Sequence, residues 1–313
     1  MKKAIFIINP VSGIGRQKDI EKIIFNEMSP NHWDTSIIYT DYRGHAKEIA
    51  NENKGKCDLI VAVGGDGTVN EIGSALIGSE TVLGILPTGS GNGLARALGM
   101  PYKIPKAIQV LNYFQRLVID TIKVNDFHSL NVAGVGFDAH ISHKFAKVKK
   151  RGPITYTQLI AKEFSKYKSA SYKITVNGET QNWDAFLISF ANSPQWGLNV
   201  KIAPYAEIDD GLIDVCIIRD FPKFTAPALL YNLLDQSIDQ NRYDVVFKAD
   251  KVKIEHEIPL LGHTDGEPVV FGNEAVIKID PSSLKVVIPP DHLKQAQNLL
   301  TPIFEMLPEI PKI

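Results

Sequence analysis

A glycine-rich string that directly follows an apolar run limits the fold of this chain more than any other feature. The run Leu59–Val63 is aliphatic, the string Gly64–Thr68 reads Gly-Gly-Asp-Gly-Thr, and a helical pattern begins at Val69. Glycines at a strand-to-helix turn let the backbone pass close to a phosphate group, and the free N–H groups at a helix start can donate hydrogen bonds to it. The string therefore predicts a strand, an anion-binding turn and a helix within an α/β fold.

Two more glycine-rich strings occur in the same context. Asn9–Gly15 follows the apolar run Ala4–Ile8, and Pro87–Gly93 follows the run Val82–Leu86. Because the carboxyl ends of parallel strands lie at one edge of a sheet, we expect the three turns to converge there as a nucleotide pocket. The chain contains neither a Gly-x-x-x-x-Gly-Lys-Ser/Thr string nor a spaced Gly-x-Gly-x-x-Gly that opens a helix, so neither a P-loop nor a dinucleotide fingerprint is predicted.

The aspartate inside the first string indicates which chemistry the turn could serve. Asp66 would repel a phosphate unless a divalent cation or a structural role offsets its charge, so it points to magnesium and phosphoryl transfer. The alternative is a tight turn in which Asp66 only caps the helix that follows.

The pattern of apolar runs changes near residue 120. Before this point short aliphatic runs alternate with helical patterns, which is typical of a doubly wound, mostly parallel sheet. After it, β-rich segments dominate, and several alternate apolar with polar residues, as half-buried antiparallel strands do. We expect an α/β domain over residues 1–120, to which residues 290–313 return partly as a helix, and a β-sandwich-like domain over residues 121–289. The β-rich segments are 117–124, 130–137, 172–176, 185–190, 213–218, 245–255 and 269–287, and helical patterns lie at 154–167 and 225–238.

Taken together, these strings resemble the diacylglycerol kinase catalytic-domain family of lipid kinases, which includes bacterial diacylglycerol and phosphatidylglycerol kinases as well as sphingosine and ceramide kinases. The resemblance rests on Asn9–Gly13, Gly64–Glu71 and Gly134–Ala139 and extends over nearly the whole chain. It implies an NAD-kinase-like architecture of two domains, ATP and Mg2+ as cofactors, and a lipid hydroxyl as the phosphate acceptor. The string Gly89–Leu94 is closer to the sphingosine and ceramide kinases, so the acceptor stays open between a glycerolipid and a sphingoid base or ceramide.

The resemblance also assigns residues to the nucleotide. Thr40, directly after the apolar run Thr35–Tyr39, matches the family's nucleotide-contacting threonine, and Ser90 keeps a hydroxyl that could bond a phosphate. The complete expected set is Asn9, Pro10, Ser12, Gly13, Thr40, Gly64, Gly65, Asp66, Gly67, Thr68, Asn70, Glu71, Gly89, Ser90 and Asn92.

A late string, Thr264–Glu267, matches the family's catalytic Asp-Gly-Glu. Because a lipid hydroxyl is a poor nucleophile, a carboxylate within hydrogen-bond reach can accept its proton as the bond to phosphorus forms. We expect Asp265 to be this base, Glu267 to orient or assist it through a shared hydrogen-bond network, and Asp66 to complete the catalytic set. Without the family, Asp265-Gly266 is an ordinary hairpin turn.

The segment 204–215 is similar to the family's site for a structural Mg2+. The resemblance implies a carboxylate ligand at Asp210 and main-chain oxygen ligands at Glu207 and Leu212, and oxygen ligands suit this hard cation. A polar turn between strands explains the same composition.

Other functions compete with the lipid kinase. A soluble-metabolite kinase such as NAD kinase shares the Gly-Gly-Asp-Gly and Asn-Glu elements but not the Asn-Pro-Val-Ser-Gly opening. Loss of Asp66 or Asp265 would have indicated an inactive nucleotide-binding regulator, and both are present. A nucleic-acid partner is not expected, because no aromatic RNA-binding string or helix-turn-helix pattern occurs.

The overall composition does not predict membrane binding, so any contact with a membrane must come from a local patch of residues. The net charge of −1 gives no global attraction to an anionic bilayer, and no apolar stretch approaches the roughly 18 residues of a membrane span. A basic patch between Lys144 and Lys173 has apolar residues interleaved, so we expect either peripheral membrane contact or a solvated helix face with its apolar side in the core. The patch comprises Lys144, Lys147, Lys149, Lys150, Arg151, Lys162, Lys166, Lys168 and Lys173, and the interleaved residues are Phe145, Ile154, Tyr156, Leu159, Ile160 and Phe164.

Cys57 and Cys216 lie in apolar runs without paired spacing and suit buried free thiols of a reducing cytosol. We therefore expect a cytoplasmic protein that associates peripherally with the membrane during turnover. An exposed edge strand in the β-rich domain could also pair two subunits as a homodimer.

Overall fold

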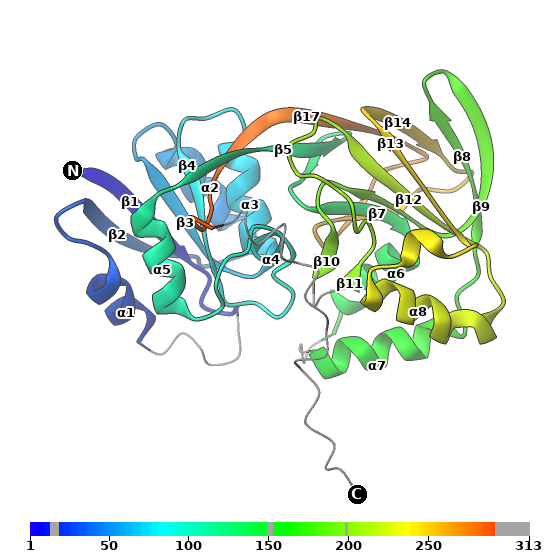
Figure 1. The fold of residues 1–313 in the computed structure, drawn as a ribbon, viewed down its shortest axis with the longest axis horizontal. Helices are drawn as coiled ribbons and strands as arrows, with labels where there is room; N and C mark the ends of the chain where they lie inside the picture. The colour runs from blue at the N-terminus through cyan, green and yellow to red at the C-terminus, as the bar shows by residue number, and fades with distance from the viewer. Residues whose placement is uncertain (13–18, 149–152, 198–199, 292–313) are drawn as a thin grey trace, which may run out of the picture.

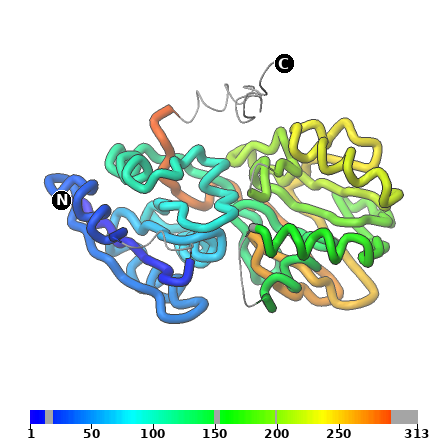
Figure 2. The backbone as a smooth tube through the Cα atoms, turned by 90° about the horizontal axis from the view of Figure 1, so that it is seen from below, coloured from blue at the N-terminus to red at the C-terminus, as the bar shows by residue number. Residues whose placement is uncertain are grey.

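The computed structural model describes residues 1–12, 19–148, 153–197 and 200–291. Two lobes lie side by side and are joined by long strands (Figure 1), and the view from below separates the blue N-terminal lobe from the green and yellow lobe (Figure 2). The helix expected from about residue 290, and with it the return of residues 292–313 to the first domain, lies outside the described residues.

Four parallel strands form the core of the first lobe. β1 (Lys2–Ile8) lies between β2 (Trp33–Tyr39) and β3 (Leu59–Gly64), and β3 pairs with β4 (Val82–Pro87). All residues of β3 and β4 are buried, which explains why these strands are continuous aliphatic runs. The parallel register places the carboxyl ends of the four strands at one edge of the sheet.

Helices cover both faces of this sheet. α1 packs with α5 and α2 packs with α3, and the two pairs lie on opposite faces (Figure 1). The helices are α1 (Ile20–Glu27), α2 (His45–Asn53), α3 (Asp66–Leu76), α4 (Gly93–Ala97) and α5 (Ile104–Tyr113). The predicted doubly wound α/β domain is confirmed.

The second lobe is a β-sandwich of antiparallel strands. The first part of the long strand β9 pairs with β8, and its last part pairs with β7 and β12, so β9 belongs to both layers. Helices α6, α7 and α8 cover one side of the lobe (Figure 1). The strands are β6 (Phe127–Ser129), β7 (Val132–Gly136), β8 (Ala170–Val176), β9 (Glu179–Ala191), β10 (Gln195–Gly197), β11 (Val200–Lys201), β12 (Ile213–Arg219), β13 (Asp244–Ala249), β14 (Lys251–Glu255), β15 (Leu261–Thr264) and β16 (Glu267–Val270). The helices are α6 (Phe137–Phe145), α7 (Pro153–Phe164) and α8 (Ala226–Asp235), with short 3-10 turns at Lys223–Thr225 and Ile238–Gln240.

Two long strands join the lobes. β5 (Arg116–Val124) pairs antiparallel with β17 (Glu274–Val287), β17 pairs with β14 near its start, and Val286 near its end lies beside Leu83 of β4. Apart from the separate β10–β11 pair, the described strands of both lobes therefore form one continuous hydrogen-bonded network. The domain boundary expected at residues 120–121 falls inside β5.

Two predicted β-rich segments are each divided. Residues 245–255 form most of β13 and all of β14, separated at Asp250, and residues 269–287 form the end of β16 and all of β17. Gly272, with a φ of 81°, lies in the turn between these last two strands. Among the described residues β13 pairs only with β12, so it is an edge strand. A dimer formed through such an edge stays a prediction.

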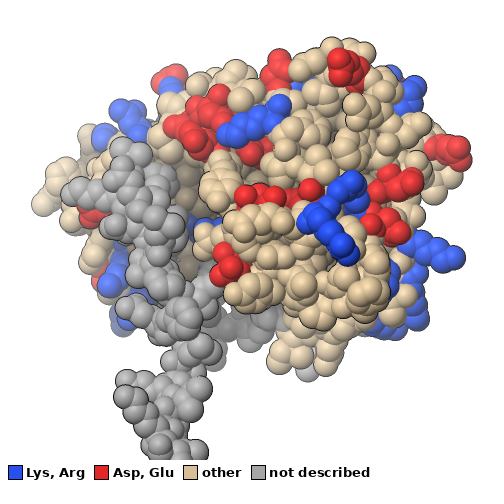
Figure 3. Space-filling model, turned by 45° about the vertical axis from the view of Figure 1, so that its right-hand side comes forward, with Lys and Arg blue, Asp and Glu red and all other residues tan. Residues whose placement is uncertain are grey.

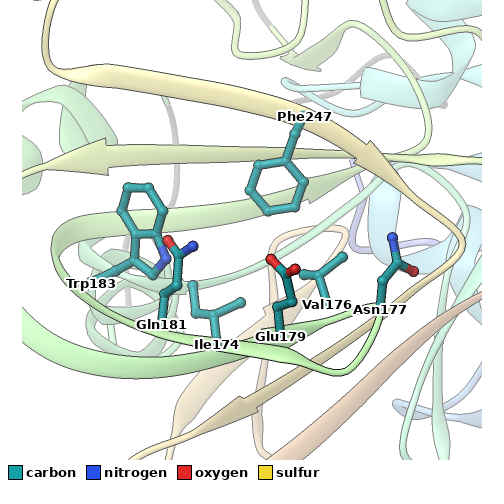
Figure 4. A pocket seen from close by; sticks show the side chains of 7 residues that line it. All are labelled: Ile174, Val176, Asn177, Glu179, Gln181, Trp183 and Phe247. Atoms are coloured by element: carbon teal, nitrogen blue, oxygen red, sulfur yellow. The ribbon is translucent and has the colours of Figure 1, made fainter.

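The open end of the sandwich lies between β13 and the β8–β9 hairpin. Phe247 of β13 faces Ile174 and Trp183 there, and these side chains line a pocket (Figure 4). None of the lining residues belongs to the glycine-rich strings or to Thr264–Glu267, so this pocket is separate from the predicted site.

The apolar side of α7 faces the protein interior, as the solvated-face alternative requires. Four interleaved apolar residues pack against the core cluster that α7 shares with α8, and these are Tyr156, Leu159, Ile160 and Phe164. Ile154, in contrast, is 75% exposed. Lys144 lies 3.8 Å from Glu163, and Lys173 lies 3.5 Å from Glu255. The patch residues Lys149, Lys150 and Arg151 lie outside the described residues.

Acidic and basic side chains are interspersed on the face shown in Figure 3, around a broad area without charge. No helix within the described ranges is long and apolar enough to cross a membrane.

Candidate active site

Three loops meet at the carboxyl edge of the parallel sheet. They are residues 9–12 after β1, 64–68 at the end of β3 and 88–93 after β4. The N–H groups of Thr88 and Gly89 donate to the carbonyl oxygen of Gly64 at 3.0 and 3.3 Å. A Cβ atom at Gly89 would lie 2.5 Å from the Cα atom of Gly65, so the second and third loops touch through bare backbone. This contact explains the glycines at positions 65 and 89.

The carboxylate of Asp66 fastens the second loop to the third. Asp66 is the first residue of α3, yet it accepts the N–H groups of Asn92 and Gly93, at 2.8 and 2.6 Å, where α4 begins. The alternative that Asp66 only caps its own helix is therefore wrong. Burial raises the pKa of Asp66 to about 6, and the two N–H donors offset part of this effect.

Two threonines fasten the first loop to its neighbours. The side-chain amide of Asn9 donates to Thr68 Oγ1 at 3.0 Å, and the hydroxyl oxygens of Ser12 and Thr88 lie 3.2 Å apart. Both threonines are buried, so they fix the loop from the inside. Gly13, also expected to bind the nucleotide, lies outside the described residues.

The other expected nucleotide residues differ in their exposure. Thr40 is buried at the same sheet edge, and its N–H group donates to the main chain of β1 at 2.9 Å. Pro10 and Ser90 are exposed and accessible to a ligand. Asn92 is buried with a left-handed φ of 52°, and its side chain forms two hydrogen bonds with the main chain of Gly89. Asn92 therefore shapes the third loop from within.

The first turns of α3 also reach two more distant segments. Glu71 Oε1 accepts the N–H group of Gly44 at 2.9 Å and so holds the loop between β2 and α2. Asn70 Nδ2 donates to Asp265 Oδ2 at 2.6 Å and to the carbonyl oxygen of His128 at 2.9 Å. Asn70 and Glu71 were predicted as nucleotide residues, and in this structure they position the segments around the pocket.

Asp265 lies in a tight hairpin turn between β15 and β16. Thr264 pairs with Glu267, which leaves Asp265 and Gly266 as the turn residues, with φ values of 50° and 81°. Positive φ at both positions is typical of a type I′ turn. The hairpin alternative is therefore correct for the backbone, while the side chain of Asp265 reaches α3.

Five donors surround the carboxylate of Asp265. Oδ1 accepts from Ser129 Oγ (2.6 Å), Asn131 N (2.9 Å) and Val132 N (3.1 Å), and Oδ2 accepts from Asn70 Nδ2 (2.6 Å) and Leu130 N (2.9 Å). Both oxygens are fully bonded, so a lipid hydroxyl could pass its proton to Asp265 only after a donor moves away. Sequence patterns did not point to Ser129, the last residue of the short strand β6, or to the main-chain N–H groups that follow it, because none of them belongs to a recognised motif.

Glu267 does not share this network, contrary to expectation. Its Oε2 accepts from Arg43 Nη2 at 2.7 Å, and a Cβ atom at Gly67 would lie 2.7 Å from its Oε1. Glu267 therefore lies over the first turn of α3 and pairs with the loop between β2 and α2. No sequence pattern pointed to Arg43, which lies in an exposed loop.

A buried histidine supports the hairpin. His263 Nε2 lies 3.0 Å from Asp138 Oδ2, and the N–H group of Gly266 donates to His263 Nδ1 at 3.3 Å. Because Nδ1 accepts, the ring proton is assigned to Nε2, where it faces Asp138. The string that contains Asp138 thus helps to hold the turn that carries Asp265.

Of the expected magnesium ligands, Asp210 bonds groups of the protein itself, and the main-chain oxygens of Glu207 and Leu212 stay predicted ligands. The two carboxylate oxygens of Asp210 accept the N–H group of Leu212 at 2.9 Å and Lys248 Nζ at 2.5 Å. Lys248 lies opposite Asp214 in the β12–β13 pairing, and its Nζ is 3.7 Å from Asp214 Oδ2. In the part of the chain that the structure describes, no three His, Cys, Asp or Glu side chains are grouped to hold a metal ion. The ammonium group of Lys248 supplies the positive charge here, so a cation at Asp210 would have to displace it.

Two family descriptions together cover most of the chain. Residues 3–124 match "Diacylglycerol kinase catalytic domain", and residues 131–288 match "YegS C-terminal NAD kinase beta sandwich-like domain". The chain is 31% identical over 241 residues to the "Probable lipid kinase YegS" of Salmonella arizonae, which covers 75% of this chain and 79% of that protein. It is 30% identical over 257 residues to a "Probable lipid kinase YegS-like" protein of Yersinia enterocolitica, with 80% and 85% covered.

Solved structures share the architecture. A "putative diacylglycerol kinase" from Bacillus anthracis has a TM-score of 0.76 at 26% identity, with 92% of this chain and 98% of that chain covered. An NAD kinase from Archaeoglobus fulgidus in complex with ATP has a TM-score of 0.54 at 14% identity, with 95% and 98% covered, which shows the fold alone. The predicted two-domain architecture and the resemblance are confirmed. The chain belongs to the diacylglycerol kinase catalytic-domain family of lipid kinases, with a second domain of the NAD kinase-like β-sandwich type.

Proposed function

We propose that this lipid kinase transfers the γ-phosphoryl group of ATP, taken up with Mg2+, to the hydroxyl group of diacylglycerol or a related glycerolipid. The observation that supports the proposal best is the meeting of three loops at the start of α3, facing the hairpin of Asp265 and Glu267. The first turn of a helix offers free N–H donors and a favourable dipole to phosphate groups.

Phosphoryl transfer depends on positioning and charge more than on covalent chemistry of the protein. In this proposal Asp265 accepts the proton of the lipid hydroxyl while the bond between that oxygen and phosphorus forms and ADP leaves. The hydroxyl would take the place of the Asn70 amide at Oδ2, and Asn70 would keep its bond to the carbonyl oxygen of His128. Glu267 is the alternative acceptor, because one of its oxygens already faces Gly67.

A second class of acceptor lipid also has support in the sequence. A sphingoid base or ceramide is the second candidate, which the composition of the string Gly89–Leu94 favours. Both acceptors present a hydroxyl next to an apolar body.

Label transfer from ATP tests the proposal. The protein is incubated with γ-labelled ATP, Mg2+ and, in separate reactions, diacylglycerol, phosphatidylglycerol, a sphingoid base, ceramide and NAD. We expect label on a glycerolipid. Label on the sphingoid base or ceramide would instead identify the enzyme as a sphingoid-base or ceramide kinase. Label on NAD alone, or on no product, would contradict the lipid kinase reaction.

We also propose that the enzyme meets its lipid at a membrane surface through the outer sides of α7 and α8. The apolar exposed residues of this region are Ile154, Phe224, Leu230, Tyr231 and Leu234. Lys162, Lys166 and Lys168 are exposed as well. Apolar side chains can enter the lipid interface, and each lysine near an anionic bilayer contributes about 1 kcal/mol.

Vesicle sedimentation tests this contact. Replacing Lys144, Lys162, Lys166 and Lys168 with glutamine should weaken binding to vesicles that contain phosphatidylglycerol and leave ATP affinity unchanged. Unaltered vesicle binding would contradict the proposed contact.

A further inference from the structure

We propose that Arg43 neutralises Glu267 and thereby allows the phosphate groups of a nucleotide to bind over the first turn of α3. The inference deepens the proposed function and rests on it, since it requires ATP at the Gly64–Thr68 loop. Arg43 is thus a positioning residue for the phosphoryl donor, contributed by the loop between β2 and α2.

The geometry places a carboxylate where an anion is expected to bind. Glu267 Oε1 would lie 2.7 Å from a Cβ atom at Gly67, so it is in contact with the glycine-rich turn itself. A phosphate group at the N–H donors of this turn would therefore lie next to a negative charge. Such a like-charge contact opposes binding of the phosphate.

Arg43 is the cation paired with this carboxylate. Its Nη2 lies 2.7 Å from Glu267 Oε2, on the other side of the carboxylate from the oxygen that faces Gly67. The planar guanidinium group has five N–H donors, so Arg43 can bind a phosphate oxygen and keep its contact with Glu267.

Stability does not explain this ion pair. The side chains are 70% and 37% exposed for Arg43 and Glu267, and exposed ion pairs of this kind contribute little to folding. The pair connects segments that are 224 residues apart in the chain.

The backbone beneath Arg43 is held in place by the glycine-rich helix. Gly44, the next residue, has a φ of 91° and donates its N–H group to Glu71 Oε1 at 2.9 Å. On the other side, the rings of Tyr42 and His45 stack at 4.6 Å between centroids. The same helix whose first turn is expected to receive the phosphates therefore fixes the base of the arginine.

A double-mutant cycle tests the inference. Wild type, Arg43→Gln, Glu267→Gln and the double variant are compared for the dissociation constant of ATP without lipid and for kcat and KM with lipid. We expect Arg43→Gln to weaken ATP binding about tenfold or more, because an uncompensated carboxylate then faces the phosphates. Glu267→Gln should bind ATP at least as tightly as wild type, and the double variant should recover most of the affinity that Arg43→Gln loses.

Arg242→Gln is the matched control, because Arg242 is an exposed arginine of the second lobe whose side chain contacts Tyr243. It should leave ATP affinity unchanged. Unchanged ATP affinity in Arg43→Gln, or no recovery in the double variant, would overturn the inference. Failure of wild type to bind ATP would instead contradict the proposed function, and thermal unfolding curves of all variants identify any loss of folding.

Discussion

The side-chain amide of Asn70 donates a 2.6 Å hydrogen bond to Asp265, which lies 195 residues later in the chain. This bond connects the glycine-rich helix of the first domain to the hairpin of the second. It belongs to a set in which each polar side chain at the start of α3 holds a different segment. The members are Asp66 with the third loop, Thr68 with the first loop, Asn70 with the hairpin and Glu71 with the loop before α2. One helix therefore aligns both halves of the site.

Replacing Asp265 with asparagine should abolish turnover and leave ATP affinity largely unchanged. The amide cannot accept the hydroxyl proton, and its NH2 group would face the N–H donors that now bind the carboxylate. This conflict should also lower the free energy of unfolding by about 1–3 kcal/mol. Initial rates, ATP titration and thermal unfolding measure the three effects.

The matched variant is Glu267→Gln, which keeps the hairpin and removes the other carboxylate. Loss of turnover in Glu267→Gln together with activity in Asp265→Asn would make Glu267 the proton acceptor. Full activity of Asp265→Asn alone would already show that Asp265 is not the base.

ATP binding should weaken below about pH 6 because of Asp66. Its pKa is raised to about 6 by burial, so near this pH the carboxylate gains a proton and no longer accepts well from both Asn92 and Gly93. The link between the second and third loops then loosens. ATP titrations over a pH series measure the effect.

The control for this pH series is Asp66→Asn, which should bind ATP more weakly at neutral pH and lack this part of the pH dependence. ATP itself gains a proton in the same range for both proteins, so the difference between the two curves reports on Asp66. Parallel curves for wild type and the variant would contradict the assignment.

Local sequence patterns were sufficient to predict the strands of the parallel sheet and the glycine-rich turns. Strands that are buried on both faces require continuous aliphatic runs, and turns in close backbone contact require glycine. The aliphatic run of β3 and the glycines at 65 and 89 are examples. The partners of the site carboxylates could not be predicted. Arg43 reaches Glu267 from an exposed loop of the other domain, and Ser129 reaches Asp265 from the short strand β6 of the same domain, so only tertiary packing brings each pair together.

Replacing Asp244 with asparagine should stabilise the protein at alkaline pH. Burial raises the pKa of Asp244 to about 7, and the charge of Asp239 adds to this. The value in the unfolded chain is about 3.9, so the folded state loses stability as the pH rises from about 4 through 7. Asparagine removes this loss, and we expect a gain of about 1–3 kcal/mol above pH 7 and little change near pH 4.

Chemical unfolding of wild type and Asp244→Asn at several pH values gives this comparison. Asp239→Asn is the control, because Asp239 is exposed and its removal relieves only the repulsion between the two carboxylates. A variant that is equally stable or less stable than wild type at about pH 8 would contradict the argument.

Lys248 should make the stability of this protein independent of divalent cations. Its ammonium group bonds Asp210 and lies near Asp214, which strand pairing places directly opposite. The metal site in segment 204–215 was implied by the family resemblance, and the lysine beside Asp210 could not be foreseen because a later strand contributes it. We expect the melting temperature of wild type to be unchanged by EDTA or by millimolar Mg2+. Lys248→Met leaves the carboxylates uncompensated, so it should lose about 1–2 kcal/mol of stability and regain part of it when Mg2+ or Ca2+ is added. Destabilisation of wild type by EDTA would show instead that a cation is bound at Asp210.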